Sequence, residues 1–106
     1  MATMTKKGGL LSLRAKTAVD FPRQNEVVAA KDYTVRISAP EGAVGVEVAV
    51  DQGDWQACRP AVGYWWYDWS GYEEGEHELI ARAKGPDGKT SSSGACEFFV
   101  DFRPRD

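Results

Sequence analysis

The residues with the chemistry for catalysis or metal binding are few in this sequence and stand far apart. His77 is the only histidine, so it would need a positioned partner to act as a general base, and a zinc site would lack ligands. The serine run 91–93 follows a turn and lacks the GxSxG pattern of an activated nucleophile. Cys58 and Cys96 do not form a CxxC pair. These observations predict a protein that is not an enzyme and that has no catalytic residue, metal site or cofactor.

Charge is unevenly distributed along the chain, although the net charge of −3 gives no general attraction to nucleic acid or to acidic lipid. Basic residues precede the first acidic residue, and from Trp65 to Glu78 every formal charge is acidic. Both segments fit ordinary solvated surface, or they attract each other within one molecule or between two. The basic residues are Lys6, Lys7, Arg14 and Lys16, and the acidic ones are Asp68, Glu73, Glu74, Glu76 and Glu78.

A chain of 106 residues is long enough for one domain with a modest core. We expect residues 1–9 to form a flexible N-terminal arm and residues 10–106 to form the folded domain. No run reaches transmembrane length, and the apolar stretch before Arg14 is too short for the core of a signal peptide. The sequence therefore predicts a cytoplasmic protein without membrane insertion, in which Cys58 and Cys96 stay reduced.

Alternation of apolar and polar residues, rather than a helical period, dominates the chain after residue 30. Strands are predicted over 33–39, 44–50, 55–59, 64–69, 77–84 and 89–102, with a kink at Gly94, and shorter ones within 11–19 and 26–29. Turn signals separate them, including a hairpin turn over 51–54 in which Gly53 is expected to take positive φ. About seven short strands indicate an all-β, immunoglobulin-like antiparallel β-sandwich, with a small barrel as the structural alternative.

One side of each predicted strand is expected to face the core of this sandwich, because side chains alternate along a strand. The residues predicted to be buried between the two sheets are Ile37, Val46, Val48, Leu79 and Phe98.

Three sequence features follow one another between Val44 and Ser93. A V-x-V-x-V strand meets an acid-plus-glycine turn and a tryptophan, then an aromatic strand, then a G-x-H-x-L-x-A-R-A strand with a D-G turn. The residues concerned are Val46, Val48, Val50, Asp51, Gly53, Trp55, Trp66, Trp69, Gly75, His77, Leu79, Ala81, Arg82, Ala83, Asp87 and Gly88. This stretch resembles the immunoglobulin-like early-set domains, especially the C-terminal dimerisation domain of sulfite-oxidase-type molybdenum enzymes and related bacterial modules. The resemblance implies a sandwich that tends to associate and that has no catalysis of its own.

The segment from Tyr64 to Tyr72 is unusually aromatic on both faces of one predicted strand. A sandwich core is only about 10 Å thick, and valines, Leu79 and Phe98 already fill it, so some of these rings should remain at the surface. The predicted partner-binding residues are Trp65, Tyr67, Trp69, Tyr72, Glu73 and Glu74, with the first three at the centre and the acids on the rim. The alternative is that the arm and loops of the same domain cover both faces.

Exposed tryptophan and tyrosine rings suit two kinds of partner. Protein contact benefits from their large area and polar handle, and this predicts a non-catalytic binding or assembly module that forms a homodimer or joins a larger complex. The second kind of partner is a glucan-type sugar stacked on the rings, as in a carbohydrate-binding module. Single-stranded nucleic acid is not expected, because the charge near the rings is acidic.

Overall fold

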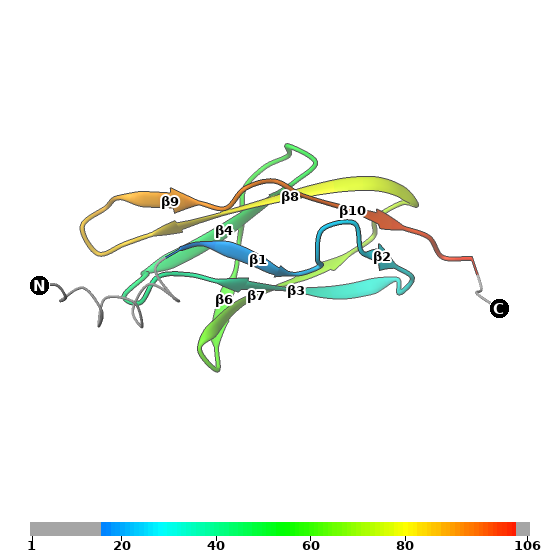
Figure 1. The fold of residues 1–106 in the computed structure, drawn as a ribbon. Coiled ribbons are helices and arrows are strands. Elements are labelled where there is room, and N and C mark those ends of the chain that lie inside the picture. Colours follow the sequence, from blue (N-terminus) through cyan, green and yellow to red (C-terminus); the bar gives the residue numbers. More distant parts are fainter. Residues whose placement is uncertain (1–15, 104–106) are drawn as a thin grey trace, which may run out of the picture.

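The computed structural model describes residues 16–103, which form two β-sheets packed face to face (Figure 1). The strands are β1 (Ala18–Phe21), β2 (Val27–Val28), β3 (Asp32–Ser38), β4 (Gly45–Val50), β5 (Gln56–Ala57), β6 (Arg59–Ala61), β7 (Tyr64–Ser70), β8 (Gly75–Lys84), β9 (Thr90–Ser92) and β10 (Cys96–Val100). The predicted arm over 1–9 and the first part of the predicted strand 11–19 lie outside the described residues. No helix in the described range is long and apolar enough to span a membrane.

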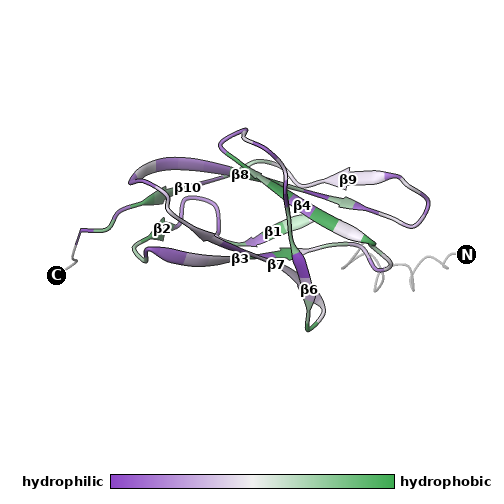
Figure 2. Cartoon of the chain, turned by 180° about the vertical axis from the view of Figure 1, so that it is seen from behind, coloured by the Kyte–Doolittle hydropathy of each residue, from purple (hydrophilic) through white to green (hydrophobic). Residues whose placement is uncertain are grey.

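The four-stranded sheet has the order β1-β3-β7-β6, and the six-stranded sheet has the order β2-β10-β8-β4-β5 with β9 also paired to β8. Every pair is antiparallel except β10 with β2, which is parallel. The predicted all-β, immunoglobulin-like sandwich is therefore confirmed. Figure 2 shows strong hydrophobic colour along β4 at the centre of the molecule and pale colour on the edge strand β9.

The core lies between the sheets and contains all five residues predicted for it. Ile37, Val48, Leu79 and Phe98 are 0% exposed, and Val46 is 2% exposed. Each comes from the inward side of an alternating strand, which is why the sequence pattern identified them. Burying side chains of this size stabilises the fold by roughly 1.5–3 kcal/mol each.

The turn after β4 differs from the prediction. Positive φ falls on Asp51 (51°) and Gln52 (63°) rather than on Gly53, whose N–H donates to the Val50 carbonyl at 2.9 Å. Aspartate tolerates this conformation better than most residues. Here the Asp51 carboxylate also accepts a hydrogen bond from the Glu78 N–H at 2.9 Å, which ties the turn to β8.

The predicted return strand over 55–59 is split between the two sheets. β5 pairs with β4, whereas β6 pairs with β7, so the chain changes sheets at Cys58. Pro60 is accommodated because β6 is an edge strand, where no ladder hydrogen bond is lost. Val62 and Gly63 then form the tight turn between β6 and β7, where the sequence indicated only a break.

The kink predicted at Gly94 is present. β9 and β10 pair with the same strand, β8, but their registers are offset by one residue between Ser92 and Cys96. The extra residue produces a bulge in the last strand region. Cys96 begins β10 facing the core, and both Cys96 and Cys58 are unpaired, as predicted.

Candidate interaction surface

The inner side of β7 carries the rings that the sequence assigned to an exposed interface. β7 pairs with β3 so that Trp65, Tyr67 and Trp69 stand opposite the inward-facing residues Ile37, Val35 and Tyr33. Residues opposite each other share a face, so these rings point into the sandwich. Trp69 is only 7% exposed, and the other two are half-buried against the core. The expected exposure of this ring set is therefore wrong, because pairing with β3 determines the inward face.

Trp69 lies at the centre of an aromatic cluster at one end of the core. Tyr72 stacks on it with ring centroids 3.8 Å apart, and Phe98 meets it edge-on at 5.5 Å. The Tyr72 hydroxyl donates a hydrogen bond to the Ala30 carbonyl. Stacking of Tyr72 on Trp69 and the hydrogen bond of its hydroxyl thus hold the loop after β7 against the sandwich.

The predicted acidic rim makes contacts within the domain. The Glu74 carboxylate accepts a hydrogen bond from the Phe102 N–H at 2.7 Å, and the Glu73 backbone carbonyl lies 2.7 Å from His77 Nε2. Both residues are exposed. Partner binding by Trp65, Tyr67, Trp69, Tyr72, Glu73 and Glu74 stays a prediction.

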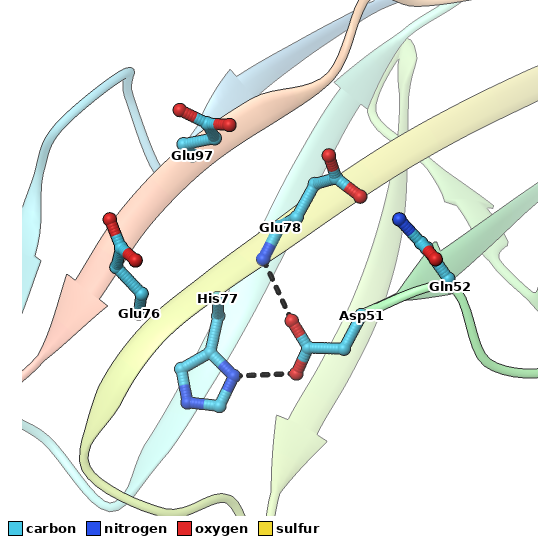
Figure 3. A pocket seen from close by; sticks show the side chains of 6 residues that line it. All are labelled: Asp51, Gln52, Glu76, His77, Glu78 and Glu97. Atoms are coloured by element: carbon cyan, nitrogen blue, oxygen red, sulfur yellow. Dashed lines mark hydrogen bonds and ion pairs between the residues drawn. The ribbon is translucent and has the colours of Figure 1, made fainter.

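His77 is held from two sides at the start of β8 (Figure 3). Nδ1 lies 2.7 Å from a carboxylate oxygen of Asp51, and Nε2 faces the Glu73 carbonyl. Burial lowers the pKa of His77, but the carbonyl and the carboxylate both favour a protonated ring and together raise the pKa above its ordinary value. In Figure 3 the ring turns toward Asp51 and not toward Glu76.

This histidine borders an acidic hollow of about 320 Å³, lined by Asp51, Gln52, Glu76, His77, Glu78 and Glu97. Both ring nitrogens are already engaged, so the ring has no free nitrogen to take a proton from a substrate. Among residues 16–103, no group of three His, Cys, Asp or Glu side chains is arranged to hold a metal ion. The arrangement acts as a clamp between the turn after β4 and the start of β8.

The outer side of β7 carries a second set of aromatic residues. Together with their neighbours on β1 and β3, they form what we call the outer aromatic face: Phe21, Arg36, Tyr64 and Trp66. The Arg36 guanidinium carbon lies 4.8 Å from the Phe21 ring centre and 4.1 Å from the Tyr64 ring centre. Trp66 meets Tyr64 edge-on at 6.1 Å, and its indole N–H donates to the Ala61 carbonyl at 2.9 Å. All four residues of the face are half-buried.

Ion pairs border the outer aromatic face. Arg36 Nε lies 3.2 Å from Asp20, which also accepts a hydrogen bond from Ser38 at 2.6 Å. On the other side, Arg59 contacts both carboxylate oxygens of Asp68 at 3.1 and 3.2 Å. Hydrogen bonds from Arg59 and then from Thr34 lower the pKa of Asp68. An apolar centre with a fixed polar border is the usual anatomy of a protein interface.

Sequence reasoning missed this face because it placed the wrong aromatic set outward. One signal was available in the alternation itself. Asp68 shares its parity with Tyr64 and Trp66, and a carboxylate on the inward side would be costly to bury.

No protein-family model matches this sequence, and no curated protein matches it. Among solved structures, the fibronectin(III)-like modules of Clostridium thermocellum CbhA are similar to it, with a TM-score of 0.70 and 20% identity over 84% of this chain and 99% of theirs. The chain has the fold of a fibronectin(III)-like module. At this level of identity the similarity establishes the fold alone.

An engineered protein of known structure is also similar, with a TM-score of 0.66 and 23% identity over 80% of this chain. The match covers 20% of that protein's length. Both similarities agree with the immunoglobulin-like sandwich. The narrower resemblance to the dimerisation domain of sulfite-oxidase-type enzymes is not shown by them.

Proposed function

We propose that this chain is a non-catalytic module that mediates protein–protein association through the outer aromatic face. The observation that carries the proposal is the placement of Tyr64 and Trp66 on the outward side of a sheet, with Arg36 between the Tyr64 and Phe21 rings. Tryptophan, tyrosine and arginine are the residues that most often dominate binding energy at interfaces.

The side chains that could take part in catalysis either make contacts within the domain or stay protonated, which also favours a binding role. His77 uses both ring nitrogens to hold Asp51 and Glu73. Burial raises the pKa of the Cys58 thiol to about 12, with a smaller contribution from Glu47, so little reactive thiolate forms near neutral pH. Ser93 bonds the Ala81 N–H and the Gly94 carbonyl, as expected of a structural hydroxyl.

The geometry of the rings favours a protein partner over a sugar. Stacking against a sugar needs a free, flat ring face, whereas Arg36 already lies 4.1 Å over the centre of Tyr64. The Trp66 and Tyr64 planes are inclined by 76°, so these two rings do not form one flat platform. Two rings held edge-on to each other, with an arginine over one of them, fit the mixed apolar and polar chemistry of a protein surface better.

The proposal is tested by the variant Trp66→Ser, with Trp55→Ser as a matched control. Trp55 is also partly exposed, but it lies near Arg82, away from the outer aromatic face. Partner capture and light scattering should show reduced association for Trp66→Ser only, with little change in the thermal midpoint of either variant. Unchanged association and an unchanged partner set for a folded Trp66→Ser protein would refute the proposal.

The sugar-binding alternative has its own measurement. We expect no change in tryptophan fluorescence when soluble glucan oligosaccharides are added at millimolar concentration. A saturable change that disappears in Trp66→Ser but persists in Trp55→Ser would favour the carbohydrate-binding module instead.

A further inference from the structure

The turn between β6 and β7 is occupied by a residue that suits it poorly. Val62 has φ of 45° and Gly63 has φ of 85°. A two-residue hairpin turn with both residues at positive φ favours Asn-Gly, because a β-branched side chain clashes with the backbone in this conformation. Val62 is also 84% exposed, so its methyl groups gain nothing from burial within this domain. Neither the local backbone nor the core explains a valine here.

The hairpin that presents Val62 is well fixed. Figure 1 shows the turn end of the β6–β7 hairpin extending beyond the rest of the sandwich. Ala61 pairs with Tyr64 across the turn, and the Ala61 carbonyl also accepts the indole N–H of Trp66. Pro60 restricts the backbone just before the turn. An apolar side chain is therefore held outward at the end of a braced hairpin, which keeps the entropy lost on binding low.

A groove that can receive such a side chain lies at the base of the same hairpin. Its volume is about 580 Å³, within the range of small binding pockets. The apolar residues that line it are Val44, Val46, Ala57, Cys58, Trp65 and Ala83. Val44 is 62% exposed, so an occupant of the groove would cover apolar surface that is now in water. Trp65, one of the predicted partner-binding residues, thus borders a surface that a partner can reach.

Charges beside the two features are complementary. The hairpin carries the ion pair of Arg59 with Asp68, and the groove lies beside the ion pair of Glu47 with Arg82. All four side chains are substantially exposed. When a hairpin approaches a groove, Arg59 can meet Glu47 and Asp68 can meet Arg82, so neither surface presents an unmatched charge.

We propose that the occupant is a second copy of this chain, with Val62 of each copy inserted into the groove of the other. This contact uses none of the four residues of the outer aromatic face, so it goes beyond the proposed function and adds a second contact surface. Each copy supplies one Val62 and one groove, so a single two-fold axis between the hairpins would satisfy both contacts at once. The contact closes as a dimer and does not propagate into a filament.

The decisive variant is Val62→Asn, because its effects on folding and on association are opposite. Asparagine favours the turn conformation, so the thermal midpoint should stay the same or rise. The dimer should dissociate at least about ten-fold more readily, as expected when a central apolar contact is lost. Sedimentation velocity over a dilution series measures the second effect. If Val62 had only a structural role, the thermal midpoint and the dissociation of the dimer would not change in opposite directions.

Two further variants complete the test. Val44→Lys places a charge at the exposed mouth of the groove and should weaken the dimer to a similar degree. Val27→Asn alters another exposed valine, on β2 at the edge of the six-stranded sheet, and should leave the dimer unchanged. A wild-type protein that stays monomeric throughout the dilution series, or Val62→Asn and Val44→Lys proteins that dimerise like wild type, would overturn the inference. Those results would leave the proposed function standing, since Trp66→Ser tests that separately.

Discussion

The two sides of β7 use the same residue types for opposite purposes. On the inner side, Trp69 is enclosed by Tyr72 and Phe98 and belongs to the core. On the outer side, Trp66 and Tyr64 are half-buried, and Arg36 lies over the Tyr64 ring. The inner rings stabilise the fold because they are closely packed and water is excluded from them. The outer rings keep surface that a partner can still cover.

The comparison shows that aromatic content alone does not identify an interface. What distinguishes the two sides is the neighbouring strand. β3 presents Val35 and Ile37 to one side of β7 and Arg36 to the other, so the pairing of the strands assigns each ring to core or surface. Pairing with β3 therefore determines whether each ring on β7 belongs to the core or to the surface.

The largest difference between the two sides should appear on truncation. Trp69→Ala should lower the free energy of unfolding by about 3–5 kcal/mol, because it leaves a cavity beside Phe98. Trp66→Ala should cost clearly less, since water already reaches that ring. Urea denaturation monitored by circular dichroism measures both. Equal losses in the free energy of unfolding for Trp69→Ala and Trp66→Ala would contradict this difference between the two sides of β7.

The same contrast should hold on β8. Leu79 is fully buried, whereas its neighbour Ile80 faces the other side of the strand and is half-buried. Leu79→Ala should lower the free energy of unfolding by roughly 2–5 kcal/mol, and Ile80→Ala by less. A Leu79→Ala protein as stable as wild type would place the core elsewhere.

A smaller effect should follow the charge on His77. Burial lowers the folded pKa of His77, but the contacts with Glu73 and Asp51 outweigh it and raise the pKa above the unfolded value near 6.5, so protonation stabilises the fold. This stabilisation is fully present below pH ~6.5 and is lost as the pH rises through the folded pKa. Urea denaturation between about pH 5 and pH 9 should show the loss in wild type but not in His77→Gln.

The matched control for this pH dependence is Glu76→Gln. Glu76 borders the same hollow but makes no contact with the ring in Figure 3, so the pH dependence should survive in that variant. Equal pH profiles for wild type and His77→Gln would rule out the clamp as the source.

The smallest effect concerns the thiols. Cys96 is buried with its Sγ 3.2 Å from the Pro22 carbonyl, and Cys58 is half-buried on the groove side. Because neither forms a disulfide, a reducing agent should leave the thermal midpoint unchanged. A midpoint that falls on reduction would contradict the unpaired state.

The fold could be predicted from the sequence because its signal is local. Alternation placed Ile37, Val48 and Leu79 in the core, and a glycine in a long strand region indicated the bulge at Gly94. The change of sheet at Cys58 was not predictable, since two short edge strands in succession read like one strand. The turn conformation at Asp51 depends on a hydrogen bond to β8, which no local pattern contains.

The candidate surface was harder to predict for a related reason. Both sides of 64–69 are aromatic, so hydrophobicity gave no preference between them. Asp68 favours the outward side for Tyr64 and Trp66, and the register with β3 agrees with this placement. The strain at Val62 was likewise hidden, because it requires knowing that the residue lies in a two-residue turn.

Oxidative footprinting of Trp66 and Trp69 tests the difference between the two sides of β7 most directly. Hydroxyl radicals label exposed indoles, and mass spectrometry locates the labels in the dilute protein and in the assembled protein. We expect Trp69 to resist labelling in both states, and Trp66 to be labelled when dilute and protected on assembly. Labelling of Trp66 that does not change on assembly, or ready labelling of Trp69 in the folded protein, would contradict the assignment of core and contact surface.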